Sequence, residues 1–218
     1  LRIGAFGEGA PPVISGMAPV TGWQDLGQGR WRAKCPECSV HPSVVTRNGV
    51  TLPLARWPNA DEAGRGYLYY EASEGRLSIT DNELPPDVDW TGGEAVLRTA
   101  AWILDRLPVA SQKGATLTFS TPATYQIPRG YGYFLQNHPA ALDRDGEWIF
   151  DSATREITVM LQDSTPAEHE FAASVIEVLI SVARSQGIVI GDLILAGARR
   201  ANLEITRGSL VTVRGIES

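Results

Sequence analysis

Apolar and polar residues alternate in short runs along most of the chain, which is the pattern of β-strands. The stretch DGEWIFDSATREITVML shows it best, because the runs WIF and ITVML flank a polar turn, DSATRE. This pattern predicts a hairpin with Trp148 and Phe150 on one face, since side chains alternate along a strand. Two registers remain open: either Val159 and Leu161 or Ile157 and Val159 oppose the two rings.

Trp148 and Glu147 in this hairpin could each have a structural or a functional role. Trp148 is expected to be a core aromatic of a β-sandwich in preference to a flat surface for a sugar ring. Glu147 is expected to be a turn or edge carboxylate in preference to a catalyst.

Further strands are predicted elsewhere. Residues 1–16, LRIGAFGEGAPPVISG, predict two short strands around a Gly-rich turn. Asn48-Gly49 lies between the apolar runs VVT and VTLPLA, and Asn-Gly in that position is a strong hairpin signal. Residues 94–106, EAVLRTAAWILDR, fit an amphipathic helix and a pair of strands equally well.

The pattern changes after residue 170, where very short apolar runs are separated by one or two polar or small residues. The triplet Ile188-Val189-Ile190 aligns with Val211-Thr212-Val213 further along the chain. Self-similarity at a period in the low twenties indicates a parallel β-helix, in which each coil stacks on the next. The alternative is a pair of ordinary meander strands. Residues expected at the bends of the coils are Gly187, Gly191, Gly197, Asn202 and Gly208.

Composition and charge narrow the choice of partners. The 22 glycines and 14 prolines favour turn-rich β structure. The net charge is −6 and no basic stripe is present, so nucleic acid is not an expected partner. No apolar run approaches the roughly 20 residues that span a bilayer, so no membrane partner is expected either. The chain lacks an initiator Met, and we expect it to be a piece of a longer protein with any targeting segment upstream.

The two cysteines, Cys35 and Cys38, lie in CPEC with His41 close behind. A structural zinc site needs four ligands, and no second C-x-x-C follows. A local disulfide or two free thiols are therefore the preferred interpretations, and no metal or cofactor is expected.

Several collinear segments resemble a known group of right-handed parallel β-helix proteins that act on polysaccharides. LRIGAFGEGAPPVISG resembles the opening coil of that group, and NGVTLPLARWPN resembles the start of an inserted β-sandwich. YGYFLQNHPAALDRDGEWIFDSATREITVML is similar to the closing part of that sandwich, and SQGIVIGDLILAGARRANLEI to the return into the coils. The similarity extends over nearly the whole chain and is loose between Asp61 and Asp89.

The resemblance implies an all-β fold, with a right-handed parallel β-helix interrupted by an inserted antiparallel β-sandwich. Residues 1–28 would form the first coil, residues 29–165 the sandwich, and residues 166–218 the resumed coils. It also favours strands for residues 94–110. The group includes β-helix glycoside hydrolases such as β-xylosidases, whose site lies in the cleft between helix and sandwich. Their catalytic carboxylates come from later coils, which implies positions C-terminal to Ser218 here.

Some residues of this chain are candidates to line such a cleft. Arg56, Trp57 and Asn59, in LARWPN, combine an apolar plate with polar donors, as a sugar site requires. The alternative is that Trp57 packs at a junction between domains. Carboxylates on or beside the predicted coils are also candidates, although solvated exposure is the usual state of such residues: Asp192, Glu204 and Glu217.

Three functions follow as hypotheses. The first is the N-terminal part of a secreted glycoside hydrolase, extracellular or periplasmic, with an oligo- or polysaccharide as its partner. The second is a non-catalytic carbohydrate-binding or cell-surface module on the same fold. The third is a polysaccharide lyase, although no acidic cluster of the type that Ca²⁺ prefers is present. The open end of the predicted helix is expected to be covered by the rest of the protein or by another chain.

Overall fold

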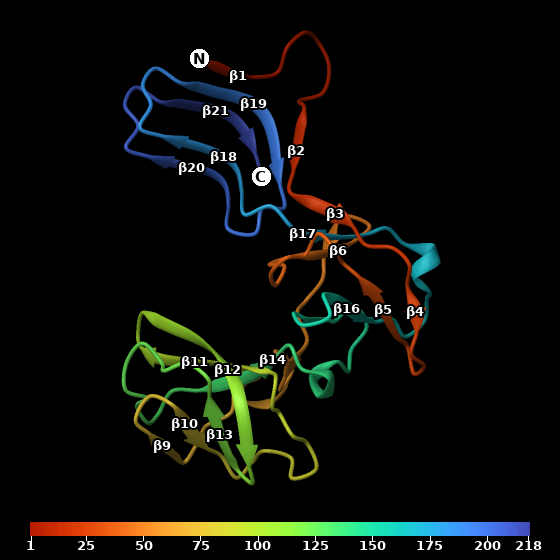
Figure 1. Cartoon of the computed structure of the whole chain (residues 1–218), viewed down its shortest axis with the longest axis vertical. Coiled ribbons are helices and arrows are strands. Elements are labelled where there is room, and N and C mark those ends of the chain that lie inside the picture. The colour runs from red at the N-terminus through yellow and green to blue at the C-terminus, as the bar shows by residue number, and fades with distance from the viewer.

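The computed structural model describes all residues, 1–218, and consists of 21 strands and three short 3-10 segments. The 3-10 segments are η1 (Ala63–Arg65), η2 (Pro139–Ala141) and η3 (Pro166–Glu168). The strands form a parallel region at one end of the molecule, a seven-stranded antiparallel sheet at the other end, and two four-stranded antiparallel sheets between them (Figure 1). The expected all-β class is confirmed.

The parallel region contains both termini of the chain (Figure 1). Strand β19 pairs in parallel with β1 and β2, and also with β21, while β18 pairs in parallel with β20. Val189 pairs with Thr212 and Val178 with Ala201, and the offset along the chain is the same in both pairs. The offset that the sequence predicts between repeated triplets is therefore confirmed. The six strands are β1 (Arg2–Gly4), β2 (Val13–Ser15), β18 (Val178–Ala183), β19 (Val189–Ala196), β20 (Ala201–Thr206) and β21 (Thr212–Glu217).

The parallel region has its own small core and a repeated bend. Ile190 and Leu195 are fully buried at the centre of a cluster of six apolar side chains. Asp192 has a φ of 60°, and Gly215, one such offset later in the chain, has a φ of 55°. Adjacent strands therefore turn at the same place, as stacked coils would. Twelve of the sixteen strand pairings in the chain are antiparallel, so what is established is an all-β protein with a short parallel region.

The seven-stranded sheet has the order β8-β14-β11-β12-β13-β10-β9. Residues 94–106, which fit helix and strand equally well in the sequence, form the whole of one strand and the beginning of the strand that pairs with it. Ala95 and Leu97 point into the larger core, whereas Arg98 is exposed, so the alternation of a strand holds. The strands are β8 (Arg56–Trp57), β9 (Ala72–Glu74), β10 (Ser78–Thr80), β11 (Glu94–Ala100), β12 (Ile103–Lys113), β13 (Thr116–Phe119) and β14 (Tyr133–Gln136).

The two four-stranded sheets enclose a second core. Its central side chains include Trp148, Phe150 and Phe171. One sheet has the order β15-β16-β5-β4 and the other β3-β17-β6-β7. The strands are β3 (Met17–Pro19), β4 (Gln24–Asp25), β5 (Arg30–Lys34), β6 (Val45–Arg47), β7 (Val50–Thr51), β15 (Trp148–Asp151), β16 (Glu156–Met160) and β17 (Phe171–Ser174).

Both predicted hairpins are present. Trp148 pairs with Val159 and Phe150 with Ile157, which decides between the two registers left open by the sequence. Trp148 is 2% exposed and its indole Nε1 donates to the carbonyl of Leu52 at 3.2 Å, so it is a core residue as expected. β6 and β7 pair across the predicted Asn-Gly turn, whose two residues have φ values of 52° and 77°.

Strands from both sides of the expected domain boundaries pair with each other. β3 pairs with β17, and β17 pairs with β6. The division at residues 28 and 165 stays a prediction, and the three hydrophobic cores give the physical units: the parallel region, the pair of four-stranded sheets, and the seven-stranded sheet.

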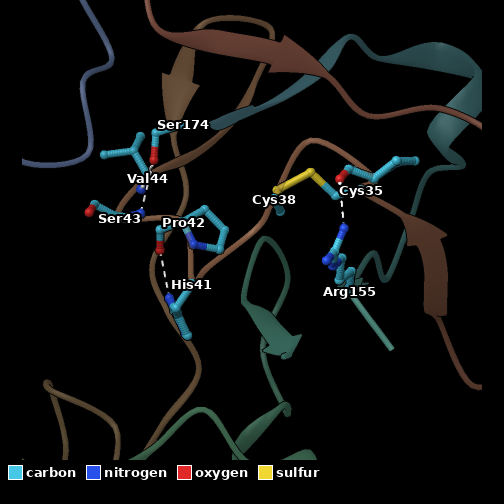
Figure 2. Close-up of a disulfide and its surroundings, with 9 residues drawn as sticks. Cys35, Cys38, His41, Pro42, Ser43, Val44, Arg155 and Ser174 are labelled. Carbon is cyan, nitrogen blue, oxygen red and sulfur yellow. Dashed lines mark hydrogen bonds between the residues drawn. A yellow bond between two sulfur atoms is a disulfide. The ribbon is translucent and has the colours of Figure 1, made fainter. Parts of the chain in front are cut away.

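Cys35 and Cys38 form a disulfide in the loop that follows β5 (Figure 2). Both residues are 1% exposed and belong to the second core. The backbone N–H of Cys35 donates to the carbonyl of Arg155 at 2.8 Å, and that of Cys38 donates to Cys35 at 2.9 Å. The disulfide therefore closes a buried turn.

We expect the Cys35→Ser/Cys38→Ser double variant to fold with a free energy of unfolding lower by about 2 kcal/mol, because the disulfide restricts only a very short loop of the unfolded chain. Urea unfolding of the oxidised protein and the variant measures this difference. Loss of folding in the variant would show that the disulfide does more than close a turn.

A second prediction concerns the outer edges of the parallel region. β20 pairs only with β18 and β21 only with β19, which leaves one edge of each strand unpaired. We expect the 218-residue polypeptide to self-associate in dilute solution. Val213→Lys on β21 should weaken this association, because a lysine blocks edge pairing. Val40→Lys, at a comparably exposed loop position, is the control. A monodisperse monomer by light scattering would contradict the prediction.

Candidate functional site

The outer face of the seven-stranded sheet carries the side chains, polar and apolar, that alternate with its core residues. Val96 lies opposite Phe134 on one neighbouring strand, and Arg98 lies opposite Leu104 on the other. Two hollows lie on this face, and Leu104 lines both of them. Leu104 is 56% exposed, so the two hollows are continuous with solvent at this point.

We call the first hollow the tyrosine pocket, and its volume is about 300 Å³. Tyr67 and Tyr69 are 39% and 57% exposed, so their rings are open to solvent. The pocket takes residues from three parts of the chain that are distant in sequence: residues 64–69, the hairpin of β11 and β12, and residues 130–132. The side chains that line it are Arg65, Tyr67, Tyr69, Arg98, Leu104 and Tyr131, and the remaining lining residues are glycines.

Arg56 contacts Tyr67, which lines the tyrosine pocket, and the loop that carries Arg65. Its guanidinium carbon lies 3.7 Å from the ring centroid of Phe134 and 5.6 Å from that of Tyr67. Nε donates to the carbonyl of Pro58 at 3.0 Å, and Nη2 donates to the carbonyl of Gly66. Burial lowers the pKa of Arg56 from its usual range. This one side chain therefore fixes the loop that carries Arg65 relative to the aromatic rings.

Asn59 closes the base of the same loop. It is 4% exposed, and its Nδ2 donates to Oε1 of Glu62 and to Oδ1 of Asp143, each at 3.1 Å. Gly66 approaches the backbone of Asn59 so closely that a Cβ would lie 2.4 Å from its carbonyl oxygen, and its φ is +68°. Only glycine fits at this position without displacing the loop.

A second close approach sets the position of Tyr67. A Cβ on Gly132 would lie 2.9 Å from the Cβ of Tyr67. The ring of Tyr67 then meets Phe134 edge-on, with centroids 5.9 Å apart. The chain segments around residues 67 and 132 can therefore lie against each other, and the tyrosine ring is held by contacts on two sides.

The tyrosine pocket is cationic. No carboxylate lines it. Arg65 and Arg98 have no salt bridge and no side-chain hydrogen bond. Arg106, on the same face of the sheet, differs: its Nη2 lies 2.8 Å from Oε2 of Glu94. The unpaired guanidinium groups are thus confined to the tyrosine pocket end of this face.

We call the second hollow the junction pocket, because it lies between the seven-stranded sheet and the loop at residues 41–43; its volume is about 310 Å³. His41 Nδ1 lies 2.6 Å from the carbonyl of Pro42 and donates to it, since a carbonyl only accepts (Figure 2). Its ring centroid lies 5.5 Å from that of Trp148. Burial lowers the pKa of His41, which favours the neutral ring.

The disulfide decides between the two preferred interpretations of CPEC, a local disulfide and two free thiols, in favour of the disulfide. No group of three or more His, Cys, Asp or Glu side chains is arranged to hold a metal ion. No helix has the length and apolar character needed to cross a membrane.

The structure brings three of the sequence-predicted residues together and separates them from the others. Trp57 stacks on Trp90 with centroids 5.3 Å apart and packs against the larger core, next to Arg56 and Asn59. None of these three side chains lines the tyrosine pocket. Contact of any of them with a substrate stays a prediction.

The predicted carboxylates lie in the parallel region, at the other end of the molecule from the seven-stranded sheet (Figure 1). Asp192 lies at the bend of β19 and pairs with Arg2 at 3.4 Å. Glu204, on β20, pairs with Arg200 at 2.6 Å, and this contact lowers the pKa of Glu204. Glu217 is exposed at the end of β21. Contact of any of the three with a substrate stays a prediction.

Glu147 has the turn role expected of it. It is 3% exposed, and its Oε2 accepts the backbone N–H groups of Asp143 and Arg144 at 3.0 and 3.1 Å. Burial raises its pKa above the usual range of a glutamate. The carboxylate is enclosed and engaged with backbone donors, which leaves it no access to a substrate.

The residues of the tyrosine pocket were missed by the sequence analysis. The run GYLYYEA contained one usable signal, because Tyr67 and Tyr69 are two residues apart and such residues share one face of an extended segment. Arg65 lies just before this run, in a part that the sequence analysis did not assign to the site, and no such local signal exists for Arg98 and Tyr131, which come from other segments.

Comparison with known proteins gives one likeness. No protein family and no curated protein matches the chain. A solved structure titled "Glycoside hydrolase" superposes with a TM-score of 0.57 at 19% sequence identity. The match covers 86% of this chain and 37% of that one. At this identity the likeness establishes a shared fold alone, one of the kind found in that glycoside hydrolase.

We expect Arg56→Lys to loosen the loop at residues 60–66, because lysine has no planar group to stack on Phe134 and fewer donors for the two carbonyls. The free energy of unfolding should fall by about 1–3 kcal/mol. Hydrogen exchange of the Gly66 amide should become faster. Arg76→Lys, at an exposed position with a single long contact to Thr124, is the control. Unchanged exchange at Gly66 would show that Arg56 does not anchor the loop.

Proposed function

We propose that this chain is part of a polysaccharide-active protein of the glycoside hydrolase type. In this proposal residues 1–28 and 166–218, which include the parallel region, belong to the first coils of a right-handed parallel β-helix, and residues 29–165 are an inserted β-sandwich. Support comes from the 86% of the chain that superposes on a glycoside hydrolase and from the constant register step between parallel strands.

The role that we assign to this chain is sugar binding. The observation that carries this role is the tyrosine pocket, a solvent-open hollow of about 300 Å³ with three tyrosines and two arginines. The apolar face of a sugar ring can pack on an aromatic ring, while its hydroxyl groups need donors and acceptors. Tyrosine hydroxyls and guanidinium groups supply these around the same hollow.

Bond cleavage is assigned to residues outside the tyrosine pocket. Glycosidic hydrolysis requires two carboxylic groups, on either side of the scissile bond, one of them as acid. No carboxylate lines the tyrosine pocket, and the buried Glu147 is engaged with backbone N–H groups. As the resemblance implies, we propose that the catalytic pair is contributed by later coils, C-terminal to Ser218.

A non-catalytic carbohydrate-binding or cell-surface module is the second candidate. One observation favours it: the tyrosine pocket lies on the seven-stranded sheet, at the opposite end of the molecule from the parallel region (Figure 1). A ligand can therefore be held there without contact to the coils in which the catalytic groups of a hydrolase are proposed to lie.

We also propose an extracellular or periplasmic location. The Cys35–Cys38 disulfide supports it, because structural disulfides persist in oxidising compartments and are rare in the cytosol of most organisms.

Titration calorimetry against a panel of neutral and acidic plant, algal and bacterial oligosaccharides tests the sugar-binding role. We expect at least one oligosaccharide to bind, and Tyr69→Ala to weaken its binding about tenfold, which corresponds to about 1.4 kcal/mol. Tyr69 is 57% exposed and makes no hydrogen bond, so its removal should leave the fold intact. Tyr125→Ala is the matched control, since Tyr125 is 47% exposed and lies outside the pocket. Absence of binding across the panel would refute the role.

A further inference from the structure

The charge of the tyrosine pocket is opposite to that of the protein. The chain has a formal net charge of −6, with 25 acidic and 19 basic side chains. The tyrosine pocket nevertheless has two arginines and no carboxylate. A hollow for a neutral sugar needs no such excess of positive charge, so this difference carries information about the ligand.

We propose that the tyrosine pocket binds an anionic sugar residue, in which a ring rests on the tyrosines and an oxyanion of the sugar lies between Arg65 and Arg98. This inference rests on the proposed carbohydrate-binding function and specifies the substrate class of the same site. A carboxylate of a uronate and a sulfate ester both present the paired oxygens that a guanidinium group binds with two parallel hydrogen bonds.

The two guanidinium groups come from different parts of the fold, and each has a supported backbone. Arg98 lies on β11 opposite Leu104 of β12, directly after Leu97, the last β11 residue that pairs with β14. Arg65 ends η1, beside Gly66, whose carbonyl accepts from Arg56. The backbone at each position is thus fixed by hydrogen bonds before any ligand arrives, which lowers the ordering cost of binding.

Both arginines are free to bind an anion. Their side chains make no salt bridge and no hydrogen bond within the protein, unlike Arg106, which Glu94 neutralises at 2.8 and 3.0 Å through two nitrogens. An anion in the tyrosine pocket would therefore gain charge-assisted hydrogen bonds without breaking any existing ion pair. An anion near Arg106 would have to compete with a carboxylate already in place.

The neutral rings add selectivity for a sugar over a simple anion. Tyr69 and Tyr131 line the pocket with no aromatic partner of their own, so their faces are available to a ligand. Inorganic sulfate or acetate would use the guanidinium groups alone. An anionic sugar would use both the charges and the aromatic surface.

The test compares matched oligosaccharides by titration calorimetry. The probes are oligogalacturonate, oligomannuronate and glucuronate-substituted xylo-oligosaccharides, the methyl ester of each, and a sulfated galactan oligosaccharide with its unsulfated form. We expect one or more anionic probes to bind at least tenfold more tightly than the corresponding neutral form. The preferred probe separates a carboxylate ligand from a sulfate ligand.

Variants test whether the preference for anionic over neutral probes arises in the tyrosine pocket. Arg65→Gln and Arg98→Gln should each reduce the affinity for the preferred anionic probe at least tenfold and reduce the affinity for its neutral form by a smaller factor, so the preference for the anionic form falls. Arg207→Gln is the matched control, because Arg207 also is an exposed, unpaired arginine with a positive φ, 53° against 60° for Arg65, and lies in the parallel region. The affinity for the anionic probe should also fall as the salt concentration rises, as screening requires.

The outcomes separate the inference from the proposed function on which it rests. Equal binding of charged and neutral probes, with Tyr69→Ala still harmful, would overturn the anionic specificity and keep the sugar-binding role. Anion preference that survives both arginine substitutions would also overturn the inference. Binding of no probe would overturn both. Binding of inorganic sulfate alone at the same affinity as the sulfated probe would show an anion site without sugar recognition, and would overturn it too.

Discussion

The stacking of the Arg56 guanidinium on Phe134 is the interaction on which the rest of the candidate site depends. The same group donates to the carbonyls of Pro58 and Gly66, so one side chain joins a strand of the seven-stranded sheet to the loop before Tyr67. A half-buried cation with this set of partners is costly to replace, because a shorter or non-planar side chain leaves carbonyl groups unsatisfied. The position of Arg65, and with it the charge of the tyrosine pocket, follows from this contact.

Local patterns predicted much of the fold, and the places where they failed have a physical reason. The Asn48-Gly49 turn could be predicted because it depends on residues adjacent in sequence, and the offset between parallel strands because it follows a sequence repeat. The register of the hairpin at residues 148–160 could not be predicted, because both candidate pairings put apolar side chains on the same face. Residues 94–106 are strands because β14 and β12 pair with β11 on both sides, and such partners are invisible in the segment itself.

The candidate site was less predictable than the fold. The sequence selected Arg56, Trp57 and Asn59 for the right chemistry, an aromatic plate with polar donors, but composition does not reveal the direction in which a side chain points. Arg56 stacks on Phe134 on the outer face of the sheet, whereas Trp57 packs on Trp90 and the buried Asn59 bonds Asp143. Their partners are up to 84 residues away in sequence. The residues that do face solvent are brought together by strand pairing and by two glycines that permit close approach of the backbone, Gly66 and Gly132.

The two ends of the outer face of the seven-stranded sheet differ in charge, and this difference affects how a polymer would lie on the face. At the junction pocket, Glu94 cancels the charge of Arg106, and burial favours the neutral form of His41. Further along the strand that carries Glu94, Arg98 opens into the tyrosine pocket without a counter-ion. Leu104 lines both hollows, so an extended ligand can pass from one to the other over an apolar side chain. Under the proposed function, a polysaccharide with occasional charged residues would bind in one register, because only the tyrosine pocket end of the face offers cations without counter-ions to a negative charge. Neutral residues of the same polymer would then occupy the junction pocket.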